Sequence, residues 1–173
     1  ISAEYGGKPL VVVNVTTKSG LGTPNGFEGE ASFGASRFHT AEAGFNARGG
    51  TASFGWFASG AASESDRFLD PVNFENLHNH GSTGRLFSRF DWILGGRDTL
   101  RFSLSGGRTD REVANLASQQ ARGQDQRAAT TDASGSLAWA HLFSEAQNLE
   151  ASVFFRASRA ELKPSGDLPD GFT

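Results

Sequence analysis

The sequence predicts an all-β protein whose strands form one antiparallel sheet in meander order. Apolar and polar residues alternate with a period of two along seven segments after Gly20, the pattern of strands that have one apolar face. Short polar or glycine-containing connections between several of these segments suit hairpins. No stretch of similar length keeps a helical stripe of apolar residues as far as a helix cap, so no substantial helix is expected.

The segment 99–108 shows the alternation most clearly, because Leu100, Phe102 and Leu104 are separated by single polar residues. The other segments repeat this pattern with phenylalanine, tryptophan, leucine or alanine on one side and charged or hydroxyl residues on the other. The seven strands are expected at 27–35, 40–48, 51–63, 84–94, 99–108, 132–143 and 148–159.

The connections between the predicted strands have two different lengths. Tight turns are expected at 46–51, 95–98 and 144–147, and long loops at 64–83 and 112–131. Short and long connections therefore alternate, apart from one further short connection near 37–39. This asymmetry is typical of outer-membrane barrels, which have short turns at one end and long loops at the other.

A soluble β-sandwich also has alternating strands and polar turns. The predicted strands, however, run for about nine to twelve residues, whereas soluble strands usually have about five or six and a tilted bilayer-crossing strand about ten. Charged residues near strand middles suit a polar lumen, although the outer face of a sandwich could also carry them. Seven strands cannot close a bacterial outer-membrane barrel. The sequence therefore predicts an incomplete part of a larger transmembrane barrel.

The first twenty residues contain a turn, a strand and an exit in close succession. Residues 4–8 read EYGGK, residues 11–17 form the β-branched run VVVNVTT, and Lys18, Ser19 and Gly20 follow. This run closely resembles the end of the plug domain in TonB-dependent outer-membrane receptors, where the barrel begins just after it. Stretches at 65–71, 97–101 and 115–120 look like a branch of these receptors that carries soluble regulatory modules ahead of the plug.

The resemblance implies two domains: residues 1–20 as the C-terminal end of a plug, and residues 21–173 as the N-terminal part of a barrel of about 22 strands. It also implies energy-coupled uptake of a scarce nutrient, such as a siderophore, cobalamin or glycan, across the outer membrane of a Gram-negative bacterium. The partners implied are outer-membrane lipid, the nutrient, and a TonB-type energy-coupling protein that binds a segment outside this chain. Because the chain begins with Ile1 and contains no methionine, it is expected to be a piece of a longer protein.

Composition excludes several other classes of function. The net charge of −3 gives no basic face for nucleic acid, and the absence of cysteine excludes disulfides and thiolate metal sites. No catalytic or phosphate-binding motif is present, so neither an enzyme nor a cofactor is expected. The mean hydropathy of −0.38 is compatible with a membrane barrel, which needs apolar residues only at alternate positions.

Two sets of residues are candidates for functional surfaces. Charged residues on the polar side of the strands are expected to face a lumen, where they would pair with the plug or with wall residues such as Asp91. Tryptophans on the apolar side are expected at the lipid interface, in an aromatic belt. The lumen-facing candidates are Glu28, Glu30, Arg85, Arg89, Arg101 and Glu150, and the interface aromatics are Trp56, Trp92 and Trp139.

His78 and His80 are separated by one residue and invite a metal interpretation. Two histidines leave further ligands unnamed, so no metal site is predicted and both are expected to be solvated on an outer loop. One other class of function stays open: a structural or adhesive β-protein, either a soluble sandwich or a porin-like barrel without a plug. The plug-exit run argues against the porin, which has no plug to leave.

Overall fold

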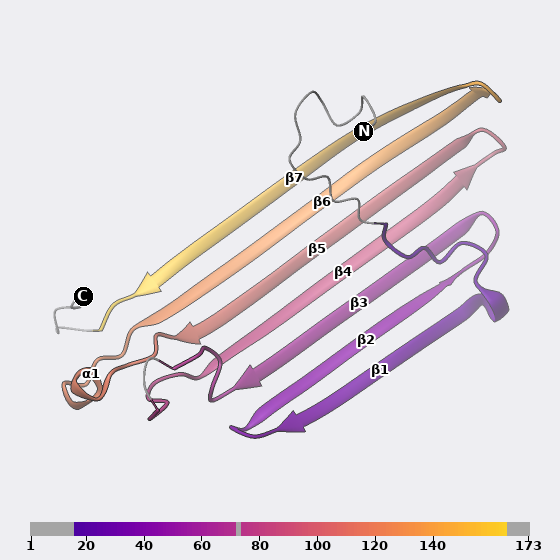
Figure 1. Cartoon of the computed structure of the whole chain (residues 1–173). Coiled ribbons are helices and arrows are strands. Elements are labelled where there is room, and N and C mark those ends of the chain that lie inside the picture. The colour runs from indigo at the N-terminus through magenta and orange to yellow at the C-terminus, as the bar shows by residue number, and fades with distance from the viewer. Residues whose placement is uncertain (1–15, 72–73, 166–173) are drawn as a thin grey trace.

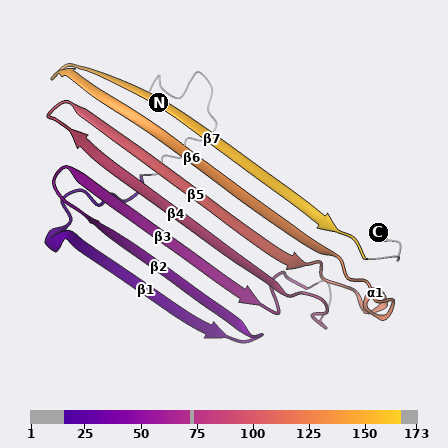
Figure 2. The ribbon, with the colours of Figure 1, turned by 180° about the vertical axis from the view of Figure 1, so that it is seen from behind.

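A computed structural model describes residues 16–71 and 74–165 of the chain. Its seven strands form a single antiparallel sheet in the order β1 to β7, so each strand pairs with its neighbours in sequence (Figures 1 and 2). The predictions of an all-β fold and of meander order are confirmed. The strands are β1 Phe27–Ser36, β2 Thr40–Gly50, β3 Phe54–Ser65, β4 Gly81–Leu94, β5 Asp98–Glu112, β6 Arg127–Ser144 and β7 Gln147–Lys163.

Most strands are longer than the sequence predicts, and the loops are correspondingly shorter. The expected turn at 46–51 is wrong, because β2 continues to Gly50, which pairs with Gly55. The long loops shrink to 66–80 and 113–126, since Gly81 still pairs with both Ser65 and Arg111. Backbone pairing continues wherever a neighbour offers partners, whereas side-chain alternation becomes weak near strand ends.

The helices in the described residues are short. A 3-10 turn, η2 (Pro24–Gly26), precedes β1, and α1 (Ala117–Ala121) lies in the loop between β5 and β6. Neither has the length or the apolar character that a membrane-crossing helix needs, and the described residues contain no other helix. The predicted strand at 11–17 lies mostly outside the described residues, and Thr16 and Thr17 belong to no strand.

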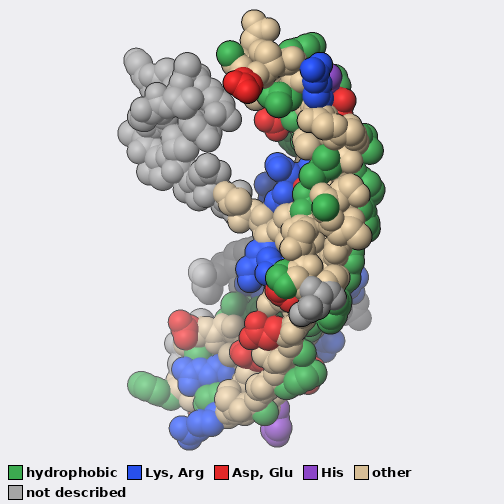
Figure 3. All heavy atoms as spheres, turned by 90° about the vertical axis from the view of Figure 1, so that its right-hand side faces the viewer, with side chains coloured by type: hydrophobic (Ala, Val, Ile, Leu, Met, Phe, Trp, Pro, Cys, Tyr) green, Lys and Arg blue, Asp and Glu red, His purple; other side chains and the backbone are tan. Residues whose placement is uncertain are grey.

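The sheet is curved, and its two faces differ in composition. Figure 3 shows the curved sheet in profile, with hydrophobic side chains gathered along its convex side. Asp91 is paired with Gly55 on β3 and Arg101 on β5, and Phe90 with Trp56 and Phe102, so neighbouring residues on one face have like character. The strand register therefore separates an apolar convex face from a concave face rich in charged and hydroxyl residues.

No second layer covers the sheet within the described part of the chain. Phe57 is its only buried hydrophobic residue, while Leu86 and Val153 on the convex face are 63% and 66% exposed. A β-sandwich would bury one apolar face against a second sheet, and all described strands belong to one sheet. The described residues alone thus leave a continuous apolar face open.

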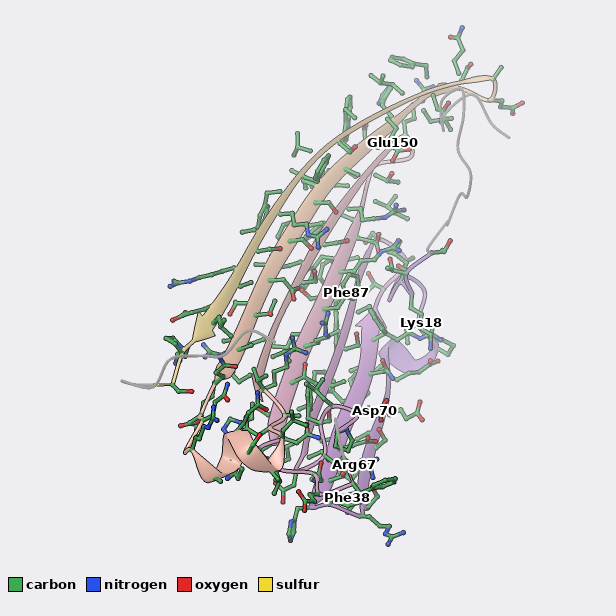
Figure 4. The ribbon with its side chains drawn as sticks, turned by 60° about the vertical axis from the view of Figure 1, so that its left-hand side comes forward. Lys18, Phe38, Arg67, Asp70, Phe87 and Glu150 are labelled. Atoms are coloured by element: carbon green, nitrogen blue, oxygen red, sulfur yellow. The ribbon has the colours of Figure 1, made fainter. Side chains whose placement is uncertain are left out.

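The two ends of the sheet carry different connections. One end has the tight turns at 51–53, 95–97 and 145–146, and the other has the loops 66–80 and 113–126 with the β1–β2 turn. In that turn Phe38 and His39 adopt left-handed φ values of 62° and 49°. Figure 4 shows Phe38, Arg67 and Asp70 together at the loop end, and Glu150 towards the opposite end.

Candidate functional site

A buried ion pair on β4 is the centre of the candidate site. Arg89 and Asp91 are two residues apart on one strand, so both side chains lie on the concave face. The guanidinium donates from Nε to Asp91 Oδ2 and from Nη2 to Oδ1, each over 2.9 Å. The two residues are only 7% and 5% exposed, which is unusual for charged groups.

The leading segment, residues 16–23, covers this ion pair. Arg89 Nη1 donates to the backbone oxygen and to Oγ1 of Thr17, both at 2.7 Å. Ser19 Oγ donates to Asp91 Oδ2 over 2.6 Å, and Arg101 Nε reaches Asp91 Oδ1 over 3.3 Å. These five residues form what we call the junction. Because both buried charges have several partners, the junction meets the condition under which buried charges are tolerated.

Glycines allow the leading segment to lie directly against the backbone of the sheet. A Cβ added at Gly55 would come within 2.2 Å of the Leu21 nitrogen, and one at Gly20 within 2.2 Å of the Trp56 oxygen. The segment is fixed further by a hydrogen bond from the Gly22 nitrogen to the Thr51 oxygen at 2.9 Å. The segment is therefore packed against the tight-turn end of the sheet.

The strand register places all six lumen-facing candidates on the concave face, the face that carries the junction. Only Arg89 and Arg101 are brought together there. Glu28 instead accepts two hydrogen bonds from Arg48 on β2, at 2.6 and 2.8 Å. No ion pair joins Glu30, Arg85 or Glu150 to another described residue, although the sequence suggested that Arg85 would pair with a neighbouring acid.

Thr17 and Ser19 were missed by sequence reasoning, which treated them only as part of a strand and its exit. Their spacing of two residues was the available signal. In an extended segment it places both hydroxyls on one side, where they can meet Arg89 and Asp91, themselves two residues apart. The contact could not be foreseen because it joins positions 72 residues apart in sequence.

A hollow on the concave face lies beside the junction. It has a volume of about 430 Å³, with a floor that includes several serines from β5 and β6. Phe87 and Phe154 line it, together with Arg156, and Thr17 of the leading segment forms part of its edge. Hydroxyls, aromatic rings and a cation can bind a polar ligand or a polar protein surface, but this set contains no nucleophile with an adjacent base.

The three tryptophans lie on the convex face near the tight-turn end. Trp92 stacks on Phe90 with ring centroids 6.0 Å apart and approaches Phe54 at 5.5 Å. Trp56 lies 6.1 Å from Phe27, and Trp139 donates its Nε1 proton to Asp98 Oδ1 over 3.0 Å. The rings thus form an aromatic row with a polar contact at its rim. Its location at a lipid boundary stays a prediction.

Three histidines lie at the loop end, and each contacts a carboxylate. Asp66 lies between His39 at 2.6 Å and His80 at 3.1 Å, while His78 Nε2 is 2.7 Å from Asp125 Oδ1. His78 and His80 therefore do not share a site. The His78 side chain is also only 10% exposed, instead of solvated as expected.

These contacts also affect the carboxylates. Hydrogen bonds from His39 and then His80 lower the pKa of Asp66, and those from Arg127 and His78 lower the pKa of Asp125. Both groups are therefore ionised at neutral pH and join the loops at this end of the sheet to one another.

Comparison of the chain with protein-family models, with curated proteins and with solved structures gives no match.

Proposed function

We propose that this chain is part of a TonB-dependent outer-membrane receptor, comprising the exit of its plug and the first strands of its barrel wall. The observation that carries the proposal is the junction. Residues 16–20, the end of the run that resembles a plug exit, lie on the concave, polar face of a curved sheet whose convex face is apolar. They are attached there by the contacts of Thr17 and Ser19 with Arg89 and Asp91.

Strand length supports a wall that crosses a bilayer. The shortest strand, β1, has 10 residues and the longest, β6, has 18, while a tilted strand needs about 9–11 residues to span the hydrocarbon core. In this arrangement Leu100, Phe102 and Leu104 face lipid. Charged convex residues such as Arg108, Asp110, Arg159 and Glu161 fall near the loop end, where headgroups and water replace hydrocarbon.

In the proposed receptor the junction anchors the plug to the wall. A nutrient binds between outer loops and plug, and a TonB-type protein pulls on a plug segment outside this chain to open a path. The buried pair then fixes the end of the plug that joins the barrel, so that movement is confined to the rest of it. The function is transport, with no catalytic step, and the location is the outer membrane.

Two measurements on the full-length protein test the proposal. The first reconstitutes Phe102→Cys and Ser103→Cys in lipid vesicles. Maleimides add to the thiolate, which does not form in hydrocarbon, so we expect a membrane-impermeant maleimide to label Ser103→Cys and to leave Phe102→Cys unlabelled until the protein is unfolded. Labelling of both positions by the impermeant reagent would overturn the membrane wall.

The second measurement tests energy coupling. Growth is compared on ferric chelates, cobalamin and glycans in strains that have or lack the receptor and the TonB-type protein. The receptor should support growth on one of these nutrients only when its partner is present. Membrane insertion without any such dependence would instead indicate the structural or adhesive barrel.

A further inference from the structure

Three potential metal ligands converge at the loop end of the sheet. His78 comes from the loop 66–80, Glu112 ends β5, and Asp125 comes from the loop 113–126. One nitrogen or oxygen atom from each lies within 4.8 Å of the other two. His78 Nε2 is 2.7 Å from Asp125 Oδ1 and 3.7 Å from Glu112 Oε1. Ligand atoms around a tetrahedral Zn²⁺ are about 3.3 Å apart, so these two separations bracket the required spacing.

The hydrogen bonding of His78 directs Nε2 into this cluster. Its Nδ1 lies 2.9 Å from the Val113 carbonyl oxygen, which can only accept, so Nδ1 carries a proton. Nε2 is then the ring nitrogen that is available to a metal ion, and it faces oxygens of two carboxylates. A bound cation takes the place of the proton through which Nε2 otherwise contacts Asp125.

His78 and Glu112, the two less exposed ligands, are each oriented by a hydrogen bond on the side away from the cluster. The Val113 carbonyl fixes the orientation of the His78 ring, and the backbone nitrogen of His80 donates to Glu112 Oε2 over 2.9 Å, leaving Oε1 towards the cluster. The Asp125 backbone nitrogen donates to Ser165 Oγ, also at 2.9 Å. Such outer contacts are characteristic of metal-binding histidines and carboxylates.

One cation already contacts the carboxylates. Arg127 Nε lies 2.8 Å from Asp125 Oδ1, and its Nη2 is 3.7 Å from Glu112 Oε1. The Arg127 side chain is 57% exposed, so it can turn into solvent. It therefore acts as a competitor that a bound metal ion must displace.

We propose that His78, Glu112 and Asp125 bind a divalent first-row transition metal, with Zn²⁺ the best match to one imidazole and two carboxylates. Water completes the coordination. The ion joins the loops 66–80 and 113–126 to the end of β5 and holds them in one arrangement. This site is independent of the proposed transport function, because it needs neither a membrane nor a nutrient.

The test is calorimetric titration of ZnCl₂ into the full-length protein without a polyhistidine tag, folded in detergent micelles. We expect saturable binding that His78→Gln, Glu112→Gln and Asp125→Asn each weaken at least about 10-fold. His80→Gln is the matched control, because the His80 side chain contacts Asp66 and its backbone nitrogen can still donate to Glu112. Arg127→Gln should tighten binding several-fold.

The Asp125→Asn variant is expected to fold, because the Asp125 side chain is 54% exposed and supports no core. It therefore keeps the test informative if another variant misfolds. Circular dichroism of the sheet identifies any variant that does not fold. The proposal is overturned if neither the wild type nor Arg127→Gln binds Zn²⁺ saturably. It is equally overturned if folded His78→Gln and Asp125→Asn bind like the wild type, or if His80→Gln abolishes binding.

Discussion

Strands β4 and β7 have the same alternation on the same sheet but very different surroundings. Arg89 on β4 has a side chain only 9% exposed, because the leading segment lies over it, whereas every residue of β7, including Arg156, is exposed. Both arginines lie on the concave face. The comparison shows that alternation decides which face a side chain occupies, while the covering chain decides whether its charge is buried.

The consequence is a difference in what each charge contributes. A buried charge that loses its partner carries a large desolvation penalty, whereas an exposed one is hydrated and tolerates substitution. Substitutions in the covered and in the open parts of the sheet should therefore differ in their effect on stability.

The largest effect is expected from Asp91→Ala in the full-length protein. Removing this carboxylate leaves the Arg89 guanidinium buried without a counter-charge, which should lower the free energy of unfolding by about 3–5 kcal/mol. Glu150→Ala, on the same face of β7, should change it by less than about 0.5 kcal/mol. Urea unfolding in lipid vesicles measures both, and equal losses would show that the leading segment does not set the burial of Asp91.

The second prediction compares the two faces at one depth on β5. Phe102→Arg places a charge on the apolar convex face and should cost about 2–4 kcal/mol of folding free energy in bilayers. Ser103→Arg puts the same side chain on the polar concave face, where water can hydrate the charge, and should cost much less. Folding titrations in vesicles that gave the same penalty for both would reject the assigned facing of the sheet.

A smaller effect is expected where the leading segment touches β3. Gly55→Ala places a methyl group against the backbone of Leu21, so the leading segment must shift. This shift should lower the free energy of unfolding by about 1–3 kcal/mol. A Cβ added at Gly84 on β4 would meet no atom within 4 Å. Gly84→Ala should therefore change the free energy of unfolding by less than about 0.5 kcal/mol. Thermal or urea unfolding distinguishes the two, and a neutral Gly55→Ala would argue against close packing of the segment.

The smallest effect concerns Asp66 at the loop end. Hydrogen bonds from His39 and His80 lower the pKa of Asp66, so the stability that they add is complete above its unfolded value of about 3.9. It is lost as the pH falls through the lower, folded pKa. Pepsin cleavage of the loop 66–80 should therefore accelerate as the pH drops below about 4. Asp66→Asn should be cleaved readily throughout, and an identical pH profile for both proteins would contradict the role of this carboxylate.

The fold was largely predictable because the alternation of Leu100, Phe102 and Leu104 reports directly on one face of a strand. Strand ends were not, since the backbone of Gly50 and Gly81 keeps pairing where side chains carry little pattern. The family resemblance, transport and location remain predictions, because none of the comparisons gives a match.

The candidate site was predictable only in part. Alternation placed Arg89, Arg101 and Asp91 on one face, but it contained nothing about the chain that covers them. The low exposure of the His78 side chain was likewise not predictable, because its partners Glu112 and Asp125 come from elements distant in sequence. Contacts between such distant elements depend on tertiary geometry, which a local sequence pattern does not report.

Meander order also has a consequence for folding kinetics. Because each strand pairs with the next along the chain, neighbouring strands meet by closing a short turn or a modest loop, at small entropic cost. The sheet can therefore grow one hairpin at a time, with the free edge of β7 as the template for a following strand. In the proposed barrel, closure against β1 is the strand pairing that joins the segments most distant in sequence. Topologies rich in such distant pairings fold slowly, so this closure is where we expect the folding rate to be determined.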